Sequence, residues 1–320
     1  MEKHPQVSIT TLLYNSADGL SQCLQAIRPE VQSGFAQMLV VDNASPDASA
    51  EIAAREIPEG EIISSPINRG FAGGCNLAWP YVQAPYWLLL NPDVIVPQGG
   101  LRTLVAWMNQ HPEIGVASPE LVDSQGKPQY AARRFPSLSR ALMVLLRLHL
   151  LLPRPRRADF FLGSDWNGSD HLNVDWVPGA AMIIRREAAE AVGLLSDQFF
   201  MYGEDMQWCW RMRNAGWRIG LCGQVQFSHQ DGGSALRTWK EVERTQRILR
   251  GTYAVCQEIH GTLYTKLLML VNTITLAATL LHPRLPPDRK RDVRNYLAAH
   301  RILWRKAKPG VKLSEAVAKR

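Results

Sequence analysis

The sequence predicts an α/β fold: a mostly parallel sheet flanked by helices, with a helical C-terminal extension. Two patterns carry this prediction. Short apolar strands alternate with helices through the first third of the chain, and the pattern turns helical after residue 236. Strands this short and apolar belong to a sheet that is covered on both faces. With 46% hydrophobic and 20% charged residues, the chain of 320 residues can fill a large core, which excludes disordered, collagen-like and coiled-coil proteins.

The expected elements follow one another along the chain. Strands are expected at 7–13, 37–41, 62–63 and 87–90, and helices at 17–28, 47–56 and 71–82. A second ordered block starts at 174–186 and continues with a helix at 204–215 and strands at 217–221 and 225–228. The helical region from Leu236 is broken near Gly261, Pro283 and Pro286-Pro287, because glycine and proline interrupt helices.

Polar residues gather just beyond three of the expected strands. Tyr14-Asn15, Asp42-Asn43 and Asn91-Pro92-Asp93 each follow an apolar run. In open α/β sheets, ligands bind at the carboxyl ends of the strands. The three clusters therefore predict one shared site.

Charge and cysteine usage narrow the class of protein. The net charge is +7, but residues 282–320 contain 12 basic and 3 acidic residues, which leaves −2 for residues 1–281. Such a basic tail favours an anionic surface, either membrane phosphate or nucleic acid. The five cysteines are widely spaced without a CxxC pair, which indicates reduced intracellular thiols and neither a disulfide framework nor a zinc site. The start, MEKHPQVSITTLL, lacks the apolar stretch of a secretory signal peptide.

Two segments have an apolar character suited to a surface. Residues 138–152 are leucine-rich and are followed by PRPRR. Residues 267–281 have no formal charge but contain threonines and an asparagine, and they are short beside the roughly 20 residues of a membrane span. Their apolar side chains recur at helical spacing, as Leu267, Leu270, Val271, Ile274, Ala278 and Leu281. This helix either packs on the core or lies at a membrane interface beside the basic tail.

Two aspartates and a histidine follow expected strands. Asp42 can accept the ring N–H of uracil or thymine, or it can be a turn or helix-capping residue. Asp93 in LLLNPDV can hold a divalent cation that bridges two phosphates, or it can belong to an Asx-Pro turn. His229 can complete a carboxylate–imidazole metal site with Asp93, or it can be structural.

The loop NRGFAGGCN (68–76) opens a helix with three glycines. Glycines let the backbone approach a ligand, and the helix N-terminus attracts phosphate. Neither a Walker pattern nor GxGxxG is present, which disfavours P-loop NTPases and Rossmann dehydrogenases. Arg69 lies either against a diphosphate or in solvent.

The stretch MYGEDMQWCWRMRNAGWRIG (201–220) is the most informative. Glu204 and Asp205 begin a helix, whose dipole stabilises ionised carboxylates there, so simple N-terminal charge is one interpretation. The bulky neighbours are more typical of a cleft, and Asp205 can then act as a general base toward an incoming hydroxyl. Trp208 and Trp210 either stack on a sugar or belong to the core.

Together these stretches resemble the family 2 glycosyltransferases with the GT-A fold, especially the rhamnosyltransferase-like branch. The matching pieces span about 7–234 in the family's order: VSITTLLYNS (7–16), VVDNASPD (40–47), NRGFAGGCN (68–76), LLLNPDV (88–94), WVPGAAMIIRRE (176–187), FFMYGEDMQWCWRMRNAGW (199–217) and HQDGGS (229–234). Each piece is weak alone, and their common order makes the resemblance specific.

The resemblance implies a role for each motif. Asp42 would contact the nucleotide base, and Asn91-Pro92-Asp93 would be a variant of the metal-binding DXD motif. His229 would be a further ligand of Mg²⁺ or Mn²⁺, and Asp205 would be the catalytic base with Glu204 as its neighbour. The other residues expected at the nucleotide sugar are Thr11, Tyr14, Asn15, Asn43, Asn68, Arg69, Gly70, Gly179 and Arg211, with Tyr202 and Trp208 toward the acceptor.

Two positions depart from the family pattern. Gln207 stands where an acid usually follows the base by two residues, and Ser196 stands where aspartate is common. Gln207 leaves Asp205 intact but weakens any transfer of acceptor contacts from relatives.

The resemblance also implies a reaction and a location. An inverting, metal-dependent transfer would move L-rhamnose from dTDP-L-rhamnose, with a UDP-hexose or UDP-galactofuranose as alternative donors. The acceptor would be a polyprenyl-diphosphate-linked saccharide in bacterial surface-polysaccharide or cell-wall synthesis, handled in the cytoplasm at the inner face of the plasma membrane. We expect a glycosyltransferase domain at 1–235, divided into a nucleotide-sugar half (about 1–125) and an acceptor half (about 126–235). Residues 236–320 would form a helical, basic, membrane-associating region, and a homo-oligomer is left open.

Three other classes of protein fit the sequence less well. A sugar nucleotidyltransferase needs a Gly-rich basic loop at the first strand, where Tyr14-Asn15-Ser16 stand. A nucleic-acid-binding tail needs interleaved aromatic and basic residues, which the sequence lacks, so we expect no nucleic-acid partner. A catalytically inactive sugar binder is opposed by the presence of Asp42, Asp93, Asp205 and His229.

Overall fold

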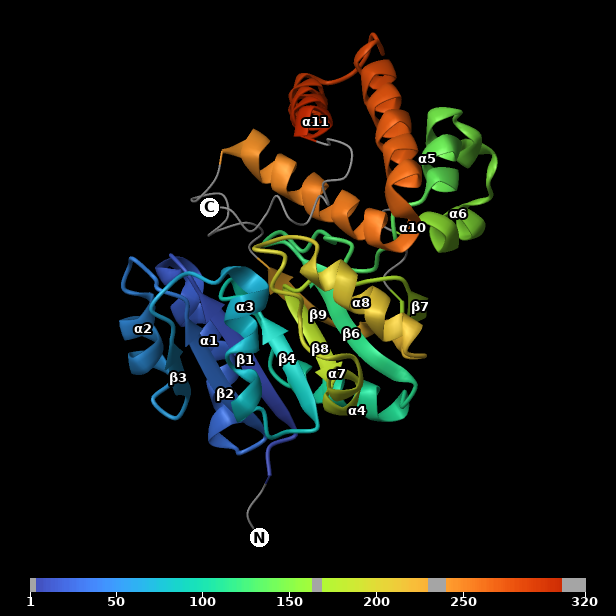
Figure 1. The fold of residues 1–320 in the computed structure, drawn as a ribbon. Helices are drawn as coiled ribbons and strands as arrows, with labels where there is room; N and C mark the ends of the chain where they lie inside the picture. The colour runs from blue at the N-terminus through green and yellow to red at the C-terminus, as the bar shows by residue number, and fades with distance from the viewer. Residues whose placement is uncertain (1–3, 163–168, 230–239, 307–320) are drawn as a thin grey trace.

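The computed structural model describes residues 4–162, 169–229 and 240–306, which form a sheet layer below a helical lobe (Figure 1). Across these residues the sheet has nine strands in the order β3–β2–β1–β4–β8–β6–β9–β5, with β7 beside β9. The predicted α/β class with a helical C-terminal extension is confirmed.

The first half of the sheet is parallel, as the alternating pattern predicts. Its strands are β1 (Val7–Leu13), β2 (Ala36–Asp42), β3 (Glu61–Ser64) and β4 (Tyr86–Leu90). The connections contain the helices α1 (Ala17–Gln32), α2 (Ser49–Glu56) and α3 (Gly70–Asn76). The helix expected at 71–82 ends early and is followed by a 3-10 turn at Trp79–Tyr81, because Pro80 cannot continue the helical hydrogen bonds.

The second half of the sheet is mixed. Strand β8 (Ala181–Arg185) runs antiparallel to β4 and to β6 (Ile114–Val122). Strand β9 (Arg218–His229) runs parallel to β6 and antiparallel to β5 (Val94–Ile95) and β7 (His171–Val174). The two strands expected at 217–221 and 225–228 are one strand, because a register shift after Cys222 absorbs the residues between them.

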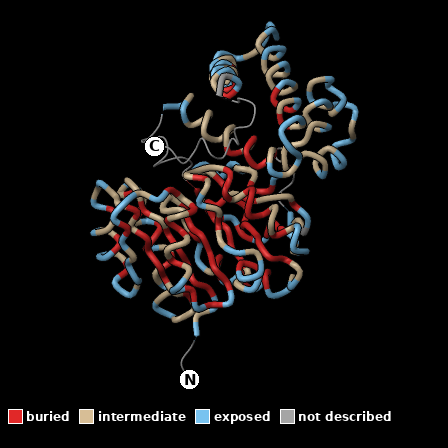
Figure 2. Tube along the Cα trace, in the orientation of Figure 1, coloured by how far each residue is buried: buried red, intermediate tan, exposed pale blue. Residues whose placement is uncertain are grey.

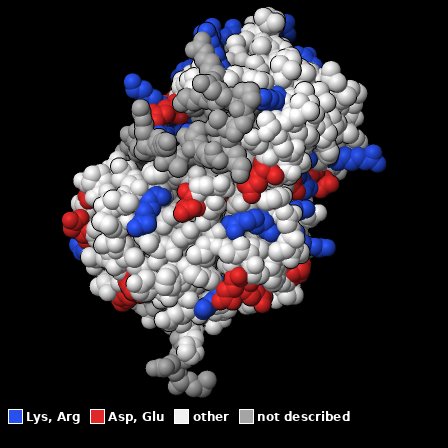
Figure 3. Space-filling view, viewed as in Figure 1, with Lys and Arg blue, Asp and Glu red and all other residues white. Residues whose placement is uncertain are grey.

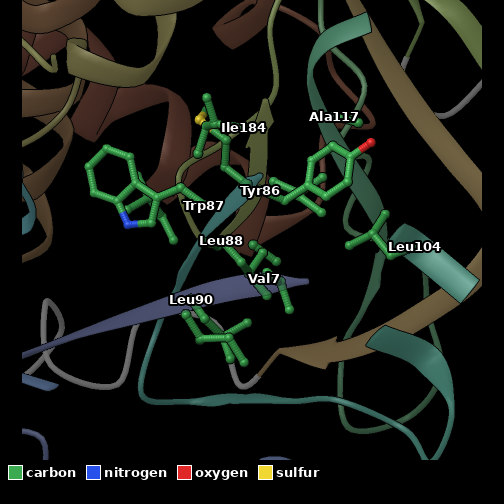
Figure 4. Close-up of a cluster of buried hydrophobic side chains, with 14 of the residues drawn as sticks. Val7, Tyr86, Trp87, Leu88, Leu90, Leu104, Ala117 and Ile184 are labelled. Carbon is green, nitrogen blue, oxygen red and sulfur yellow. The ribbon is translucent and has the colours of Figure 1, made fainter. Parts of the chain in front are cut away.

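Helices and strands enclose one large core, which Figure 2 shows as the buried centre of the sheet layer. Every residue of β4 and β6 is buried, as expected for strands covered on both faces. The helices α4 (Gly100–Gln110), α7 (Arg186–Val192) and α8 (Glu204–Asn214) complete this layer. Figure 4 shows Trp87 and Leu88 of β4 among core residues of neighbouring strands. All five cysteines are buried and none forms a disulfide.

The helical lobe joins segments that are far apart in the sequence. It contains α5 (Leu138–Leu145), a 3-10 turn η2 (Leu148–Leu151), α6 (Arg154–Phe161), α10 (Glu241–Leu280) and α11 (Pro287–Lys306). α10 is kinked at Gly261 (φ 82°, ψ 172°), and a break separates it from α11, so the predicted interruptions are confirmed. A division of the chain at residue 235 stays a prediction, and the structure adds that α5 packs against α10.

The second half of α10 places its predicted apolar stripe outward. Leu268 and Met269 are buried in a small second core, whereas Leu267, Leu270 and Ile274 are exposed. The stripe therefore does not pack on the core. By length and composition alone, α10 is long and apolar enough to cross a membrane, and most of its apolar stretch is not buried within the protein.

Candidate active site

A cavity of about 560 Å³ lies at the carboxyl ends of β1 and β4 and is bordered by the first half of α10. Most residues predicted for the site line it, although they come from distant parts of the sequence. They are Tyr14, Asn43, Asn68, Gly70, Asn91, Asp93, Gly179, Tyr202, Glu204, Asp205 and His229.

Strand register explains why the motifs meet. β1 pairs with β2 so that Leu13 is opposite Asp42, which aligns the ends of two parallel strands. β4 pairs with β8, and the N–H of Asn91 donates to the carbonyl of Ala180 at 2.8 Å. The segment around Gly179 therefore starts beside the segment around Asp93.

Asp93 and His229 form a compact pair of possible metal ligands. β5 pairs with β9 so that Val94 is opposite His229, and His229 Nε2 lies 3.4 Å from Asp93 Oδ1. Asp93 Oδ1 is buried without a hydrogen-bond partner in the described part of the chain. Two ligands of one Mg²⁺ or Mn²⁺ ion lie about 3 Å apart, so the spacing and donor types fit such an ion. No group of three or more His, Cys, Asp or Glu side chains arranged to hold a metal occurs among the described residues.

Asp205 is held by backbone amides at the start of α8. Its Oδ1 accepts from the Met206 N–H at 2.7 Å, and its Oδ2 accepts from the Gly179 N–H at 3.2 Å. Burial raises the pKa of Asp205, and these amides together with Arg133 oppose the rise. A carboxylate that is oriented in this way, with a raised pKa, suits a general base.

Glu204 lies next to Asp205 in a different environment. It is 4% exposed, and its Oε2 makes no hydrogen bond among the described residues. Burial, and secondarily the charge of Asp205, raise the pKa of Glu204 to about 8. Burial therefore favours the protonated form of Glu204 at neutral pH, whereas Asp205 has backbone amides that favour its charged form.

The glycine-rich loop forms another wall of the cavity. Asn43 is buried, donates to Asn68 Oδ1 at 3.0 Å and accepts from the Arg69 N–H at 2.9 Å. Gly70 has φ +73°, and a Cβ there would lie 2.1 Å from the carbonyl oxygen of Phe200. Only glycine permits this approach, which brings the loop against the segment preceding Glu204.

α10 rests directly on the first turn of α8. A Cβ at Gly251 would lie 2.1 Å from the carbonyl oxygen of Tyr202. Arg244 and Arg247, from the same helix, line the cavity, and Arg244 Nε donates to the Tyr202 hydroxyl at 3.3 Å.

Three predicted side chains lie outside the cavity, two of them fully buried and the third, Arg211, partly exposed. Thr11 is fully buried in β1. Trp208 is also fully buried, packs against Trp87 and donates to the carbonyl of Gly193 at 2.7 Å, so it has no surface to offer an acceptor. Arg211 donates to the carbonyls of Val192 and Leu194, which ties α8 to the end of α7.

Three further predicted residues lie near the cavity without lining it. Asp42 Oδ1 accepts from the Ser45 N–H at 3.0 Å, as expected for a turn residue. Arg69 Nε donates to Ser65 Oγ at 3.2 Å. Asn15 follows β1 with φ 52°.

Sequence reasoning missed six polar residues that line the cavity. They are Ser16, Gln129, Arg133, Arg244, Arg247 and Thr252. Gln129 and Arg133 lie in the irregular segment after β6, and the two α10 arginines reach the cavity through the packing of α10 on α8. The run of basic residues in ARR (132–134) was the available signal for Arg133, whereas no local pattern marks Gln129.

Comparison with known proteins matches residues 8–193 to the family described as Glycosyl transferase family 2. The chain is 27% identical over 229 residues to the low-salt glycan biosynthesis hexosyltransferase Agl10 of Haloferax volcanii, covering 70% of this chain and 66% of that protein. It is 27% identical over 213 residues to the N-acetylglucosaminyl-diphospho-decaprenol L-rhamnosyltransferase of Mycobacterium tuberculosis, covering 62% and 68%. The matches thus span about two thirds of these relatives.

A solved structure resembles the chain over nearly its whole length. It is the mannosyltransferase PcManGT from Pyrobaculum calidifontis in complex with GDP-Man and Mn²⁺, with a TM-score of 0.58 and 17% identity, covering 95% of this chain and 88% of that chain. At this identity the likeness extends to the fold, which is the GT-A type.

Proposed function

The chain belongs to glycosyl transferase family 2, and on that premise we propose an inverting, metal-dependent transfer of a sugar from a nucleotide donor to a hydroxyl acceptor in this cavity. The proposed donor is dTDP-L-rhamnose, with a UDP-hexose or UDP-galactofuranose as alternatives. The proposed acceptor is a polyprenyl-diphosphate-linked saccharide of surface-polysaccharide or cell-wall synthesis.

One observation carries the proposal: Asp93, His229 and the Glu204–Asp205 pair line the same cavity. A carboxylate–imidazole pair suits a cation that meets a diphosphate, and an aspartate with a raised pKa suits a base. Binding at the first site and proton removal at the second are the two requirements of sugar transfer.

The reaction follows from these roles. Asp205 takes the proton of the acceptor hydroxyl, and the oxygen attacks the anomeric carbon as the bond to the diphosphate breaks. The nucleoside diphosphate leaves with the bonding electron pair, and Asp205 releases the proton to solvent. A divalent cation held by Asp93 and His229 would supply Lewis-acid stabilisation of the departing diphosphate. One base acting on one face gives one displacement, and hence inversion.

Relatives support the choice of substrates. The M. tuberculosis relative is named for rhamnosyl transfer to a diphospho-decaprenol-linked sugar, and the H. volcanii relative for hexosyl transfer. A lipid-linked acceptor would place the chain in the cytoplasm, peripheral on the inner face of the membrane.

Thermal unfolding with a panel of nucleotide sugars tests the proposal. We expect dTDP-L-rhamnose with Mn²⁺ or Mg²⁺ to raise Tm by several degrees, since a ligand at roughly 100 times its Kd stabilises by about 2.7 kcal/mol. EDTA should remove most of this shift. A Tm that no nucleotide sugar changes, with or without metal, would contradict the proposal. Stabilisation by dTTP with rhamnose 1-phosphate, and turnover of that pair, would instead indicate a nucleotidyltransferase.

A further inference from the structure

Exposed apolar side chains concentrate on the helical lobe. In the described part of the chain, eleven of sixteen exposed large hydrophobic side chains lie on α5, η2 and the second half of α10 or on the residue directly after α5 or α10. They are Leu142, Val144, Leu146, Leu148, Leu150, Leu151, Leu263, Leu267, Leu270, Ile274 and Leu281, and we call this set the leucine face. The leucine face has one part on α5 and η2 and another on α10, and these parts are neighbours because α5 packs against α10 (Figure 1). Contiguous exposed apolar surface of this kind marks an interaction site.

Charge identifies the surface that would cover this face. Residues 138–157 and 262–287, which carry the leucine face, contain seven Lys or Arg and no Asp or Glu. In the view of Figure 3 the upper lobe is largely uncharged, with Lys and Arg at its edge. A second copy of the chain would bring like charges together. An anionic surface with an apolar interior matches both the positive charge and the exposed apolar side chains of these segments.

We propose that the leucine face docks on an anionic phospholipid leaflet, with its leucines in the acyl boundary and its arginines among the headgroup phosphates. This rests on the proposed function, because a lipid-linked acceptor must be reached at such a surface. The second half of α10 lies along the leaflet and does not cross the leaflet, because the polar helix α11 is hydrogen-bonded to α10. Trp304 Nε1 donates to Thr273 Oγ1 at 3.4 Å, and the Tyr253 hydroxyl lies 2.9 Å from Asn272 Nδ2 and 2.7 Å from His300 Nε2.

Vesicle flotation of the full chain tests the docking surface. We expect binding to vesicles of phosphatidylcholine that contain about 30% of the anionic lipid phosphatidylglycerol. We expect little binding to vesicles of phosphatidylcholine alone. The variant Leu146→Ser/Leu151→Ser/Leu263→Ser should lower the partition coefficient by roughly tenfold or more. Arg154→Ala/Arg156→Ala should weaken binding to the anionic vesicles and leave Tm unchanged.

The matched control is Ile62→Ser/Tyr81→Ser, two exposed apolar residues outside the helical lobe, which should bind vesicles like the parent. Retained binding by the leucine variant at unchanged Tm overturns the proposal. So does a concentration-dependent dimer that the leucine variant abolishes while the parent ignores vesicles, since the face would then meet a second copy. Sugar transfer to a short-chain, water-soluble acceptor is measured separately, so loss of docking and loss of activity are distinguishable.

A second inference concerns Gln129, which clamps His229 at two points. Gln129 Nε2 donates to the His229 carbonyl at 2.9 Å, which fixes the amide orientation. Gln129 Oε1 therefore faces His229 Nδ1, 2.7 Å away. An amide oxygen only accepts, so His229 Nδ1 must carry the hydrogen.

The geometry points to Gln129 as a positioning residue that holds His229 in its Nδ1–H tautomer. In the neutral ring Nε2 is then an acceptor that faces Asp93 Oδ1, so both atoms are set to bind one cation. This rests on the proposed function only for the cation, because the tautomer itself is a property of the chain.

Two readouts test Gln129. Proton–nitrogen correlation spectra of histidine-labelled protein above pH 8 should show His229 protonated on Nδ1, and Gln129→Met should shift it toward the Nε2–H form. Mn²⁺ titration followed by electron paramagnetic resonance, with dTDP present, should give an affinity roughly 10–100-fold lower in Gln129→Met. Gln129→Glu, which still accepts from Nδ1–H but loses the bond to the His229 carbonyl, should rescue part of that loss, and Gln125→Met serves as control.

An Nε2–H tautomer in the parent overturns the inference, as does an unchanged tautomer and Mn²⁺ affinity in Gln129→Met. If dTDP and Mn²⁺ bind nowhere, the cation site fails, while the tautomer still decides the role of Gln129.

Discussion

Asp93 and His229 face each other across the β5–β9 pairing, with 3.4 Å between Oδ1 and Nε2. Each side chain is largely buried, at 15% and 10% exposed. Buried acceptor atoms this close repel each other unless a proton or a cation lies between them. The pair is therefore where removal of one ligand should have the clearest effect on metal binding.

Asp93→Ala should abolish metal-dependent donor binding. Calorimetric titration of the nucleotide sugar should show no gain in affinity on adding Mn²⁺, because alanine has no oxygen to bind the cation. Asp197→Ala, at an exposed aspartate outside the cavity, should titrate like the parent. Undiminished heat in Asp93→Ala would refute the assignment.

Asp205→Asn should keep donor binding while turnover collapses. The asparagine oxygen can still accept from one of the two backbone amides that bind Asp205, the Met206 or the Gly179 N–H, but the side chain cannot take a proton. We expect kcat to fall by about 10²–10⁴-fold with an unchanged donor Kd. Near-normal transfer by this variant would show that another group is the base.

The sequence was most predictive where the determinants are local. Apolar runs predicted β1 to β4 closely, and the polar residues after them predicted the edge that lines the cavity. Gly261 and the prolines at 283–287 predicted the breaks in the last helices. Each of these features depends on residues close together in the chain.

Features that depend on long-range packing were not predictable. Trp208 is buried because α8 packs beside β4, and a periodic pattern does not say which face of a helix meets a sheet. Gln129 reaches His229 because β6 and β9 are neighbours, a pairing between segments far apart in the sequence. The side of α10 that stays exposed depends on the burial of Leu268 and Met269, which is also set by long-range packing.

Glu204→Gln should stabilise the protein at alkaline pH. The folded pKa of Glu204 is raised to about 8, above its ordinary value of 4.5, so the folded state holds a proton that the unfolded state loses. Stability from Glu204 is therefore present below pH 4.5 and declines as pH rises toward 8. Glutamine lacks this loss, which accrues at about 1.36 kcal/mol per pH unit up to the folded pKa, so the variant should gain about 4 kcal/mol over the parent between pH 5 and pH 9.

Denaturant unfolding at pH 5, 7 and 9 measures this difference. Glu187→Gln, at an exposed position, should run parallel to the parent at all three values. A Glu204→Gln curve that is parallel to the parent would mean that Glu204 is ionised in the folded protein.

Arg133→Met should move the acid limb of the pH–rate profile to higher pH. The positive charge of Arg133 opposes the burial-driven rise in the pKa of Asp205, so its removal should raise that pKa further. The base must be ionised to accept a proton, and kcat should therefore reach its plateau at a higher pH, by less than about one unit because Arg133 is exposed. Arg218→Met, at an exposed arginine outside the cavity, controls for net charge. A limb that stays in place while kcat falls at every pH would instead make Arg133 a substrate-binding residue.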